Sequence, residues 1–386
     1  MSAVPQLSWA QVCARRLKRH ALADPSAGAR PADVVATMCG AYAQVMTAAE
    51  WSVGVRILDS TQADVRTALW AEHSLVKTFG PRGTVHLLPT AHLPMWTGAL
   101  SALPPSTNPV PEEARLTPEQ TDAVVAAIAT ALADAELTVD ELTEAVVDLA
   151  GSWAGDPVVP AWYGMWPRWR PAMYVAASRG VLCFGANRGR TVTYTNPARW
   201  LPGLRPAAGS TALAALVERY LHAYGPATPA HFAQWLAVPR RWATELFESL
   251  SAGLRAVDVD GTAAWLAAGD TWTLPNRPTG VRLLPYFDAY TVGCQPRELL
   301  FPGRAAQRAL SGGQAGNFPV LLVDGVVAGV WHQRRSGRRV DITVEPLRRL
   351  TAAHRRDLED QVERLGHFFG GNARMTVGTV TVGGHA

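Results

Sequence analysis

The chain is almost without lysine. Lys18 and Lys77 are the only lysines among its 36 basic residues, so nearly all of the positive charge is on arginine. The planar guanidinium group of arginine suits the recognition of phosphate, although a codon bias would produce the same excess. With a net charge of +4 and an isoelectric point near 9.0, the composition permits binding to nucleic acid without requiring it.

The sequence also lacks the motifs of several kinds of site. Its four cysteines form no Cys-x-x-Cys pair, which argues against a disulfide framework and a zinc site. The cysteines are Cys13, Cys39, Cys183 and Cys294. There is no Gly-x-Ser-x-Gly, no phosphate-binding glycine-rich loop and no His-Glu-x-x-His. We therefore expect no metal and no cofactor.

Long apolar runs are absent as well. No signal-peptide core follows Met1, and no run approaches the length that spans a membrane. We therefore expect a reduced, cytoplasmic protein without membrane contacts. Its 386 residues, 48% hydrophobic and 18% charged, suffice for two or three globular domains.

The stretch SLVKTFGPRGTVHLLP, from Ser74 to Pro89, predicts a β-hairpin. Leu75–Phe79 and Thr84–Leu88 are rich in β-forming residues, and the GPRG between them supplies the turn. Upstream, TQADVRTALWAEH predicts one helix, and PADVVATMCGAYAQ predicts another that carries Tyr42 on its apolar stripe. The order helix, helix, hairpin is typical of a winged helix-turn-helix.

This pattern returns twice in weaker form. Hairpins are predicted over residues 181–194 and 254–266. The helical segments that precede them are 117–133, 138–150, 209–224 and 228–236. Three degenerate copies favour tandem winged-helix units over a solenoid of fixed period. The alternative is three ordinary helix–hairpin segments in one mixed domain.

Beyond residue 280 the sequence changes to strands and turns. VRLLPYFDAYTVG, NFPVLLVDGVVAGVWHQRRSG and RRVDITVEPL predict strands, with hairpin turns at Asp324-Gly325 and Ser336-Gly337. A long helix is predicted over Pro346–Phe368 and a last strand over Arg374–Val382. This part predicts a small β-barrel-like or half-barrel domain with one helix.

The predicted fold class is therefore α+β, with three tandem winged helix-turn-helix units followed by a small β-barrel-like domain. A proline-rich linker, LPPSTNPVPEEARLTP, separates the first unit from the second. The four predicted domains are residues 1–103, 117–203, 207–272 and 280–386.

Four arginines surround one hairpin turn near the C-terminus. They are Arg334, Arg335, Arg338 and Arg339. Such a tip suits contact with phosphates or an opened groove. The alternative is a solvated edge that charge keeps soluble. Because all four charges share one sign within six residues, we favour the phosphate contact.

Two blocks of the sequence, MCGAYAQVMTAAEWSVGVR and LVKTFGPRGTVHLLP, resemble the AlkZ/YcaQ family of winged-helix bacterial DNA glycosylases. LLPYFDAYTVG and VVAGVWHQRRSGRRVDITVEPL look like the C-terminal part of the same family, so the resemblance covers nearly the full length. It implies tandem winged helices and a β-barrel that clasp duplex DNA, and hydrolysis of the N-glycosidic bond of alkylated or cross-linked purines. Some members protect producers of DNA-alkylating natural products from their own toxin.

The catalytic signature of this family is Gln, an apolar residue and Gln, with His first in some members. It falls here on Tyr42-Ala43-Gln44, so the resemblance implies Gln44 as a catalytic residue. Tyr42 departs from the signature and either hydrogen-bonds the attacking water or a phosphate, or packs against the deoxyribose. Asp288 is the acid of interest, as a turn anchor or as an activator of water. The scarcity of lysine argues against a Schiff-base glycosylase.

The DNA-binding residues are expected mainly on the hairpins. They are Lys77, Arg82, Thr84, His86, Arg188 and Arg190, together with the four arginines of the C-terminal tip, Arg334, Arg335, Arg338 and Arg339. His86 has the alternative of a structural role inside its strand.

The leading hypothesis is a monofunctional DNA glycosylase for bulky cationic alkylated purines, such as N7-guanine or N3-adenine adducts or crosslinks, in DNA repair or self-resistance. The alternative is a catalytically silent winged-helix DNA-binding regulator or lesion-sequestering protein. The expected partner is double-stranded DNA carrying alkylated purines, which places the protein at the nucleoid. Three tandem units without an evident dimer helix suit a monomer.

Overall fold

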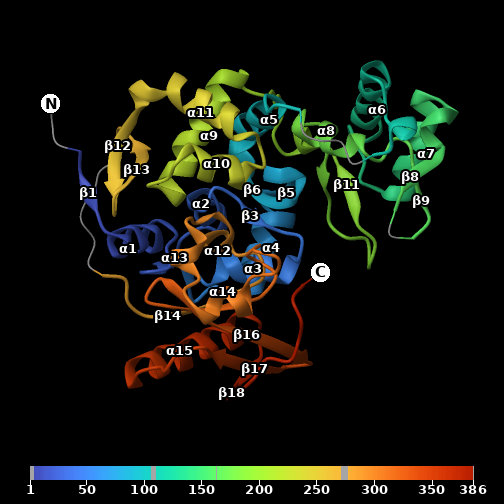
Figure 1. The fold of residues 1–386 in the computed structure, drawn as a ribbon. Coiled ribbons are helices and arrows are strands. Elements are labelled where there is room, and N and C mark those ends of the chain that lie inside the picture. The colour runs from blue at the N-terminus through green and yellow to red at the C-terminus, as the bar shows by residue number, and fades with distance from the viewer. Residues whose placement is uncertain (1–3, 106–109, 162, 271–276, 386) are drawn as a thin grey trace. The chain divides into compact units, whose positions relative to one another are not determined.

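The chain forms two compact units in a computed structural model that describes residues 4–105, 110–161, 163–270 and 277–385 (Figure 1). The first unit combines Met1–Ala68 with Val217–Ala386, and the second is Leu69–Leu216. Residues 106–109 of the proline-rich linker lie outside the described residues. Among the described residues, no helix is long and apolar enough to span a membrane.

The first unit begins with short strands and helices. They are β1 (Gln6–Leu7), α1 (Trp9–Arg19), β2 (Ser26–Ala27), α2 (Pro31–Thr37), β3 (Ala41–Tyr42), α3 (Met46–Gly54) and β4 (Ile57–Leu58), after which α4 (Gln62–Trp70) leads into the second unit. A reciprocal capping box between Ser8 and Gln11 starts α1. In α3 every residue from Ala48 to Gly54 is buried, which makes α3 a core helix.

The helix predicted across PADVVATMCGAYAQ is wrong beyond its first turns. α2 ends at Thr37, and the chain then turns at Cys39 and Gly40, whose φ angles are 55° and 97°. A residue with positive φ cannot continue a right-handed helix. Tyr42 therefore lies in β3, and the residues after Gln44 form α3, a helix that the pattern did not predict.

The chain re-enters the first unit along α9 and continues as helices and a hairpin. These elements are α9 (Gly209–Tyr224), α10 (Pro229–Leu236), α11 (Arg240–Ser249), β12 (Leu254–Val259) and β13 (Thr262–Ala267). Thr228 caps α10, which begins within the predicted helical segment 228–236. The β12–β13 hairpin also agrees with the prediction, and β1 extends it by parallel pairing with β12.

The C-terminal part is a sheet curled into a half-barrel with short helices and one long helix. Its elements are β14 (Val281–Leu284), α12 (Ala289–Gly293), α13 (Arg297–Leu300), α14 (Arg304–Ala309), β15 (Val320–Val323), β16 (Val326–Ser336), β17 (Arg339–Pro346), α15 (Ala352–Phe368) and β18 (Asn372–Val377). The strand order is β14-β15-β16-β17-β18, antiparallel except for the parallel pair β17–β18. α15 packs on β14 and β18.

Three predictions about this part are wrong in detail. The sequence AYTVG forms α12 rather than strand, because the Asp288 carboxylate accepts a hydrogen bond from the Tyr290 amide and caps a helix. The long helix starts at Ala352 rather than Pro346, since β17 runs to Pro346 in register with Gly329. The last strand is Asn372–Val377 rather than Arg374–Val382.

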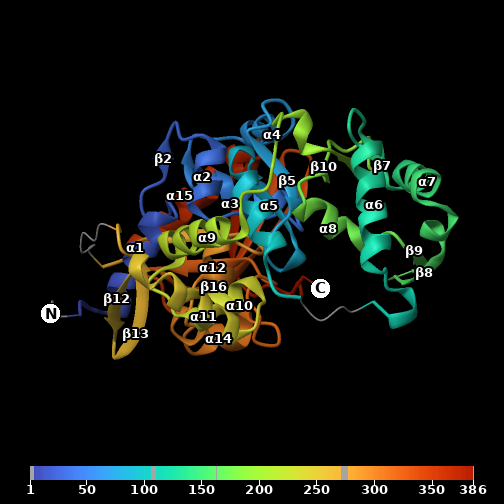
Figure 2. The ribbon, with the colours of Figure 1, turned by 90° about the horizontal axis from the view of Figure 1, so that it is seen from above.

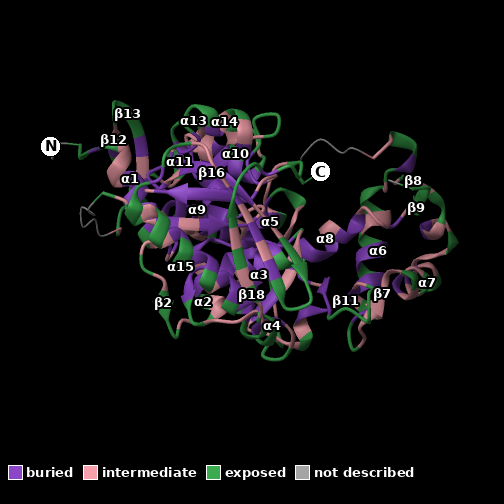
Figure 3. Cartoon of the chain, turned by 90° about the horizontal axis from the view of Figure 1, so that it is seen from below, coloured by how far each residue is buried: buried purple, intermediate pink, exposed green. Residues whose placement is uncertain are grey.

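The second unit contains the antiparallel strand pairs β5–β6, β8–β9 and β10–β11. Its strands are β5 (Leu75–Phe79), β6 (Val85–Pro89), β7 (Leu137–Thr138), β8 (Pro157–Pro160), β9 (Met165–Pro167), β10 (Cys183–Phe184) and β11 (Thr193–Thr195). Its helices are α5 (Leu93–Ser101), α6 (Pro118–Ala131), α7 (Val139–Ala150) and α8 (Ala172–Ser178). Figure 2 shows α6, α7 and α8 in one half. Val124, Ile128, Leu142 and Trp169 are fully buried in its core, and Figure 3 shows that α8 is largely buried, whereas α6 and α7 keep exposed faces.

Candidate active site

Gln44 lies in the short segment between α2 and α3. Its side chain is exposed, and it directly precedes Val45, the N-cap residue of α3. Tyr42, two residues earlier, is only 6% exposed. The structure therefore presents the Gln44 carboxamide at the surface, in front of a helix that is buried in the core, and turns the Tyr42 side chain inward.

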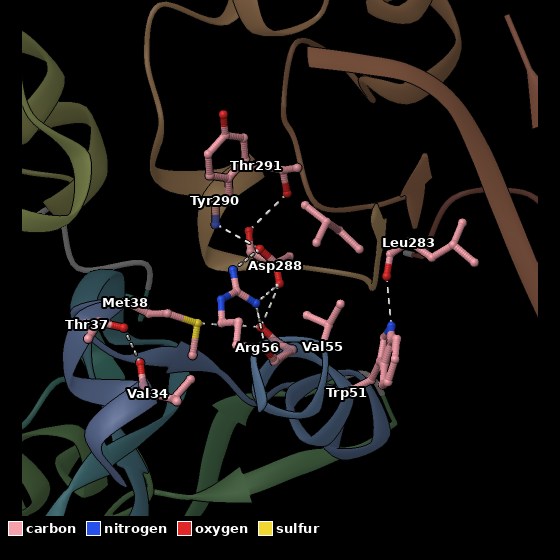
Figure 4. Close-up of polar contacts among 12 residues, drawn as sticks. Val34, Thr37, Met38, Trp51, Val55, Arg56, Leu283, Asp288, Tyr290 and Thr291 are labelled. Atoms are coloured by element: carbon pink, nitrogen blue, oxygen red, sulfur yellow. Dashed lines mark hydrogen bonds and ion pairs between the residues drawn. The ribbon is translucent and has the colours of Figure 1, made fainter. Parts of the chain in front are cut away.

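A buried ion pair lies behind α3 (Figure 4). The two terminal nitrogens of Arg56 each donate to one oxygen of Asp288, both at 2.8 Å, and both side chains have no exposed surface. The Ser52 hydroxyl donates to Oδ2 of Asp288 at 2.7 Å. Burial by itself raises the pKa of Asp288, but the Arg56 guanidinium and the hydrogen bonds that the carboxylate accepts outweigh it and hold this pKa below its usual value.

This arrangement decides between the two roles expected for Asp288. Its carboxylate accepts from Arg56, from Ser52 and from the amide of Tyr290. A carboxylate that is fully buried and bound in this way is not open to an attacking water. Asp288 is therefore an anchor, and it joins α12 to α3.

Aromatic side chains complete the buried cluster. The Tyr224 hydroxyl donates to the carbonyl oxygen of Met38 at 2.7 Å. The His20 ring lies between Tyr224 and Tyr290, with ring centroids 5.2 and 5.5 Å away. Burial, followed by the charge of Arg56, lowers the pKa of His20 from 6.5 to about 3, so the imidazole is neutral at physiological pH.

The β5–β6 hairpin carries four of the predicted DNA-binding residues. Arg82 is exposed at the turn with a φ of 62°, and Thr84 is half-buried. The Lys77 ammonium lies 4.7 Å from the centre of the Phe184 ring. His86 is only 1% exposed, its Nδ1 is 2.9 Å from the carbonyl oxygen of Thr84, and burial lowers its pKa from 6.5 to about 4. The geometry favours the structural role for His86.

The second hairpin, between β10 and β11, lies beside an acidic stretch. Residues 118–160 contain nine acidic and no basic residues, so their net charge is −9. Because the whole chain has a net charge of +4, the remaining residues carry +13. Arg188 donates to Glu141 at 2.7 Å and to the carbonyl oxygen of Glu136 at 2.8 Å. Arg190 is exposed. Because Arg188 is already paired with a carboxylate, it has less charge to offer a phosphate.

The tip between β16 and β17 presents its four arginines in two different states. Arg335 lies 4.8 Å from the centre of the Phe369 ring and donates to the Phe369 carbonyl oxygen at 3.2 Å, and Arg339 donates to Asp341 at 2.8 Å. Within the described residues Arg334 and Arg338 form no side-chain hydrogen bond or ion pair, and both are exposed. Two of the four guanidinium groups are thus fully available.

The sequence singled out Gln44 and Asp288 but missed the buried polar residues that hold Asp288 and the end of α2. Arg56, Ser52 and Tyr224 carry no motif. The available signal was a charged residue, Arg56, directly after a largely apolar helix, since a buried charge needs a partner. The described residues contain no group of three or more His, Cys, Asp or Glu side chains that could hold a metal ion.

The chain is similar in fold and in sequence to named proteins of Streptomyces sahachiroi. The structure of Streptomyces sahachiroi DNA glycosylase AlkZ matches with a TM-score of 0.80 and 28% identity, over 96% of this chain and 100% of that chain. In fold the chain is thus similar to a DNA glycosylase. An interstrand DNA cross-link repair glycosylase of Streptomyces sahachiroi is 32% identical over 342 residues, which are 84% of this chain and 87% of the relative. The model of the family "DNA glycosylase AlkZ-like" matches residues 35–368, and the chain belongs to this AlkZ-like family.

Proposed function

We propose that this DNA glycosylase hydrolyses the N-glycosidic bond of bulky, cationic alkylated purines, such as N7-guanine or N3-adenine adducts or crosslinks. One observation carries the proposal. The carboxamide of Gln44 is exposed at the surface before α3 begins. Asp288, the acid that the sequence singled out, is instead buried and bound by Arg56. The site therefore offers a neutral polar group rather than a free carboxylate.

Such a site suits a substrate that already carries a good leaving group. Alkylation at N7 or N3 places a positive charge on the purine, so no acid is needed to protonate it. The remaining tasks are to hold a water at the sugar and to stabilise the oxocarbenium character that develops at C1′. The carboxamide oxygen of Gln44 can accept a hydrogen bond from that water and direct its dipole at the developing cation. It is too weak a base to serve neutral adducts.

Tyr42 has two alternative roles in this proposal, which are to hydrogen-bond water or phosphate, or to pack. Its 6% exposure supports packing beneath the Gln44 segment. The departure from the family signature at this position then leaves the catalytic task with Gln44 alone.

The partner is DNA, and we assign the contacts to the exposed cationic side chains. Arg82 on the first hairpin, Arg190 on the second, and Arg334 and Arg338 at the C-terminal tip are exposed. The helix–helix–hairpin order supports three tandem winged-helix units, in domains 1–103, 117–203 and 207–272, before the half-barrel domain 280–386. A monomer that binds alkylated duplex DNA through all of them accounts for the distribution of positive charge.

The test is release of the damaged base. The full chain is incubated with duplex DNA that contains one N7-alkylguanine, either methyl or bulky, and free adduct base is measured by mass spectrometry. We expect release above the spontaneous rate, and faster release of the bulky adduct. Tight binding without any release would support the silent DNA-binding protein instead. The matched control is Gln44→Ala, which retains the fold because the side chain is exposed.

A further inference from the structure

Asp288 lies too deep to touch a substrate, yet Ser52 bonds it to the C-terminal end of the segment that carries Gln44. We infer that Asp288 is a positioning residue. Through its bonds to Ser52 and Arg56 it holds the C-terminal end of this segment and so fixes the position of the Gln44 carboxamide. The inference rests on the function proposed above for Gln44.

The segment in question is residues 39–51, which include β3, Gln44 and most of α3, and the residue that follows its C-terminal end, Ser52, is bonded to the Asp288 carboxylate. Met38 precedes the segment and Ser52 follows it. The Ser52 hydroxyl lies 2.7 Å from Oδ2 of Asp288 and 3.9 Å from the sulfur of Met38. The hydroxyl donates its one hydrogen to Asp288 and also contacts Met38, so the two ends lie side by side at a fixed acceptor, and the exposed Gln44 lies between them in the chain.

Further bonds hold each end of the segment. On one side, the Tyr224 hydroxyl donates to the carbonyl oxygen of Met38 at 2.7 Å. On the other side, Arg56 donates to the Ser52 carbonyl oxygen at 2.5 Å and to both oxygens of Asp288. The Trp51 indole donates to the carbonyl oxygen of Leu283 at 2.8 Å. The ends are thus attached to α9, α12 and β14, which lie far from them in sequence.

A stability role alone does not account for a buried ion pair at this place. Desolvating two charges offsets much or all of their attraction, and apolar side chains of similar volume often stabilise a core at least as well. α3 is already buried from Ala48 to Val53, where the side chains are apolar except for Ser52 and for Glu50, which is paired with Arg66. What the pair adds is a fixed orientation of the two chain segments that carry Arg56 and Asp288, because a bidentate arginine–carboxylate contact has one favoured geometry. A fixed orientation is what a water-holding carboxamide needs, since an error of about 1 Å costs on the order of a hundredfold in rate.

Ser52→Ala is the variant that tests this inference. It removes the hydroxyl that bonds α3 to Asp288 and contacts Met38, and it leaves the Arg56–Asp288 pair intact. Asp288→Asn, by contrast, leaves a buried, uncompensated guanidinium and endangers folding. The matched control is Ser178→Ala. Ser178 is also a buried helix serine, but its hydroxyl bonds only the Val175 carbonyl oxygen of its own helix, at 2.9 Å.

Two measurements are made on each variant. Hydrogen exchange followed by mass spectrometry reports the mobility of residues 39–45, and single-turnover release of N7-alkylguanine at saturating enzyme reports the reaction. For Ser52→Ala we expect exchange in 39–45 to rise at least tenfold and release to slow at least tenfold, with unchanged affinity for undamaged DNA. Ser178→Ala should change neither quantity.

A double-mutant cycle shows whether the effect passes through Gln44. If Ser52 acts by placing Gln44, then Ser52→Ala lowers the rate little further in a Gln44→Ala background. Unchanged exchange in residues 39–45, an unchanged rate despite faster exchange, or a fully additive loss in the double variant would each overturn the inference. If the wild type and Gln44→Ala release base equally, or neither does, the proposed function of Gln44 fails instead, and the exchange measurement still decides whether Ser52 holds the segment.

Discussion

Replacing Arg334 and Arg338 with alanine should weaken DNA binding through the loss of phosphate contacts alone. Both guanidinium groups are exposed, and within the described residues neither forms an ion pair. The matched control removes the same two charges from the same tip, as Arg335→Ala with Arg339→Ala. These two side chains are already held by Phe369 and Asp341.

The magnitude follows from counterion release. Each phosphate contact contributes about 0.9 to the slope of log K against log salt, so the loss of Arg334 and Arg338 should reduce that slope by about 1.8. Because the two proteins are expected to bind alike when extrapolated to 1 M salt, the affinity at 0.1 M falls about sixtyfold. The control variant should change the slope by less than about 0.9, since Arg335 is held against Phe369 and the charge of Arg339 is partly compensated by Asp341 in the free protein.

The assay is a salt titration of fluorescently labelled duplexes, with and without an N7-alkylguanine, at enzyme concentrations below the dissociation constant. Both duplexes should lose affinity equally, because phosphate contacts carry no information about the base. A quadruple alanine variant of the tip should show the sum of the two losses. If the slope is unchanged in every variant, the arginines only keep an edge soluble. If undamaged DNA binds normally and only release of bulky adducts falls, the tip probes the lesion and the phosphate reasoning is refuted.

Four other outcomes are expected. Gln44→Ala should slow single-turnover base release at least tenfold, or about 1.4 kcal/mol in the barrier, at unchanged DNA affinity, and a normal rate would remove Gln44 from the mechanism. Tyr42→Phe should release base as fast as the wild type if the Tyr42 ring only packs. If Tyr42→Phe is slow and Tyr42→Gln restores the rate, the Tyr42 hydroxyl hydrogen-bonds the attacking water. The pKa of His86 is about 4 in the folded state and 6.5 in the unfolded state, so the unfolded chain binds the extra proton and the free energy of unfolding falls as the pH drops from 6.5 to 4. In urea unfolding, His86→Gln should reduce the dependence of this free energy on pH by about 1.4 kcal/mol per pH unit. An unaltered dependence would show that His86 titrates normally. Glu144→Gln should stabilise α7 by about 0.4–1 kcal/mol in the same assay, because it removes the like-charge contacts of Glu144 with Asp140 and Asp148, four positions away on either side. A loss of stability would show that these three exposed carboxylates do not repel one another.

Hairpins and capped helices could be predicted because their causes are local. The GPRG turn lies between two β-rich runs and forms β5–β6 almost at the predicted bounds. Thr138 and Thr228 each start a helix through a bond to a residue three positions on, and both helices begin where the segments 138–150 and 228–236 were predicted.

α3 was missed for the opposite reason. A helix that is buried on nearly every side shows no alternation of apolar and polar faces, so VMTAAEWSVG has no helical signal in the sequence. α12 was mistaken for strand because a five-residue helix has no period to detect, and its start depends on the Asp288 side chain.

The sequence by itself determined the β5–β6 and β12–β13 hairpins, the arginine-rich charge, the family resemblance and the candidate residue Gln44. Only the tertiary structure decided that Gln44 is exposed while Tyr42 is turned inward, and that Asp288 is an anchor rather than a base. The physical reason is that these properties depend on the contact between Asp288 and Arg56, which are 232 residues apart, and on burial that no local spacing encodes. A carboxylate acts on water or holds a helix according to what surrounds it, and the fold supplies those surroundings.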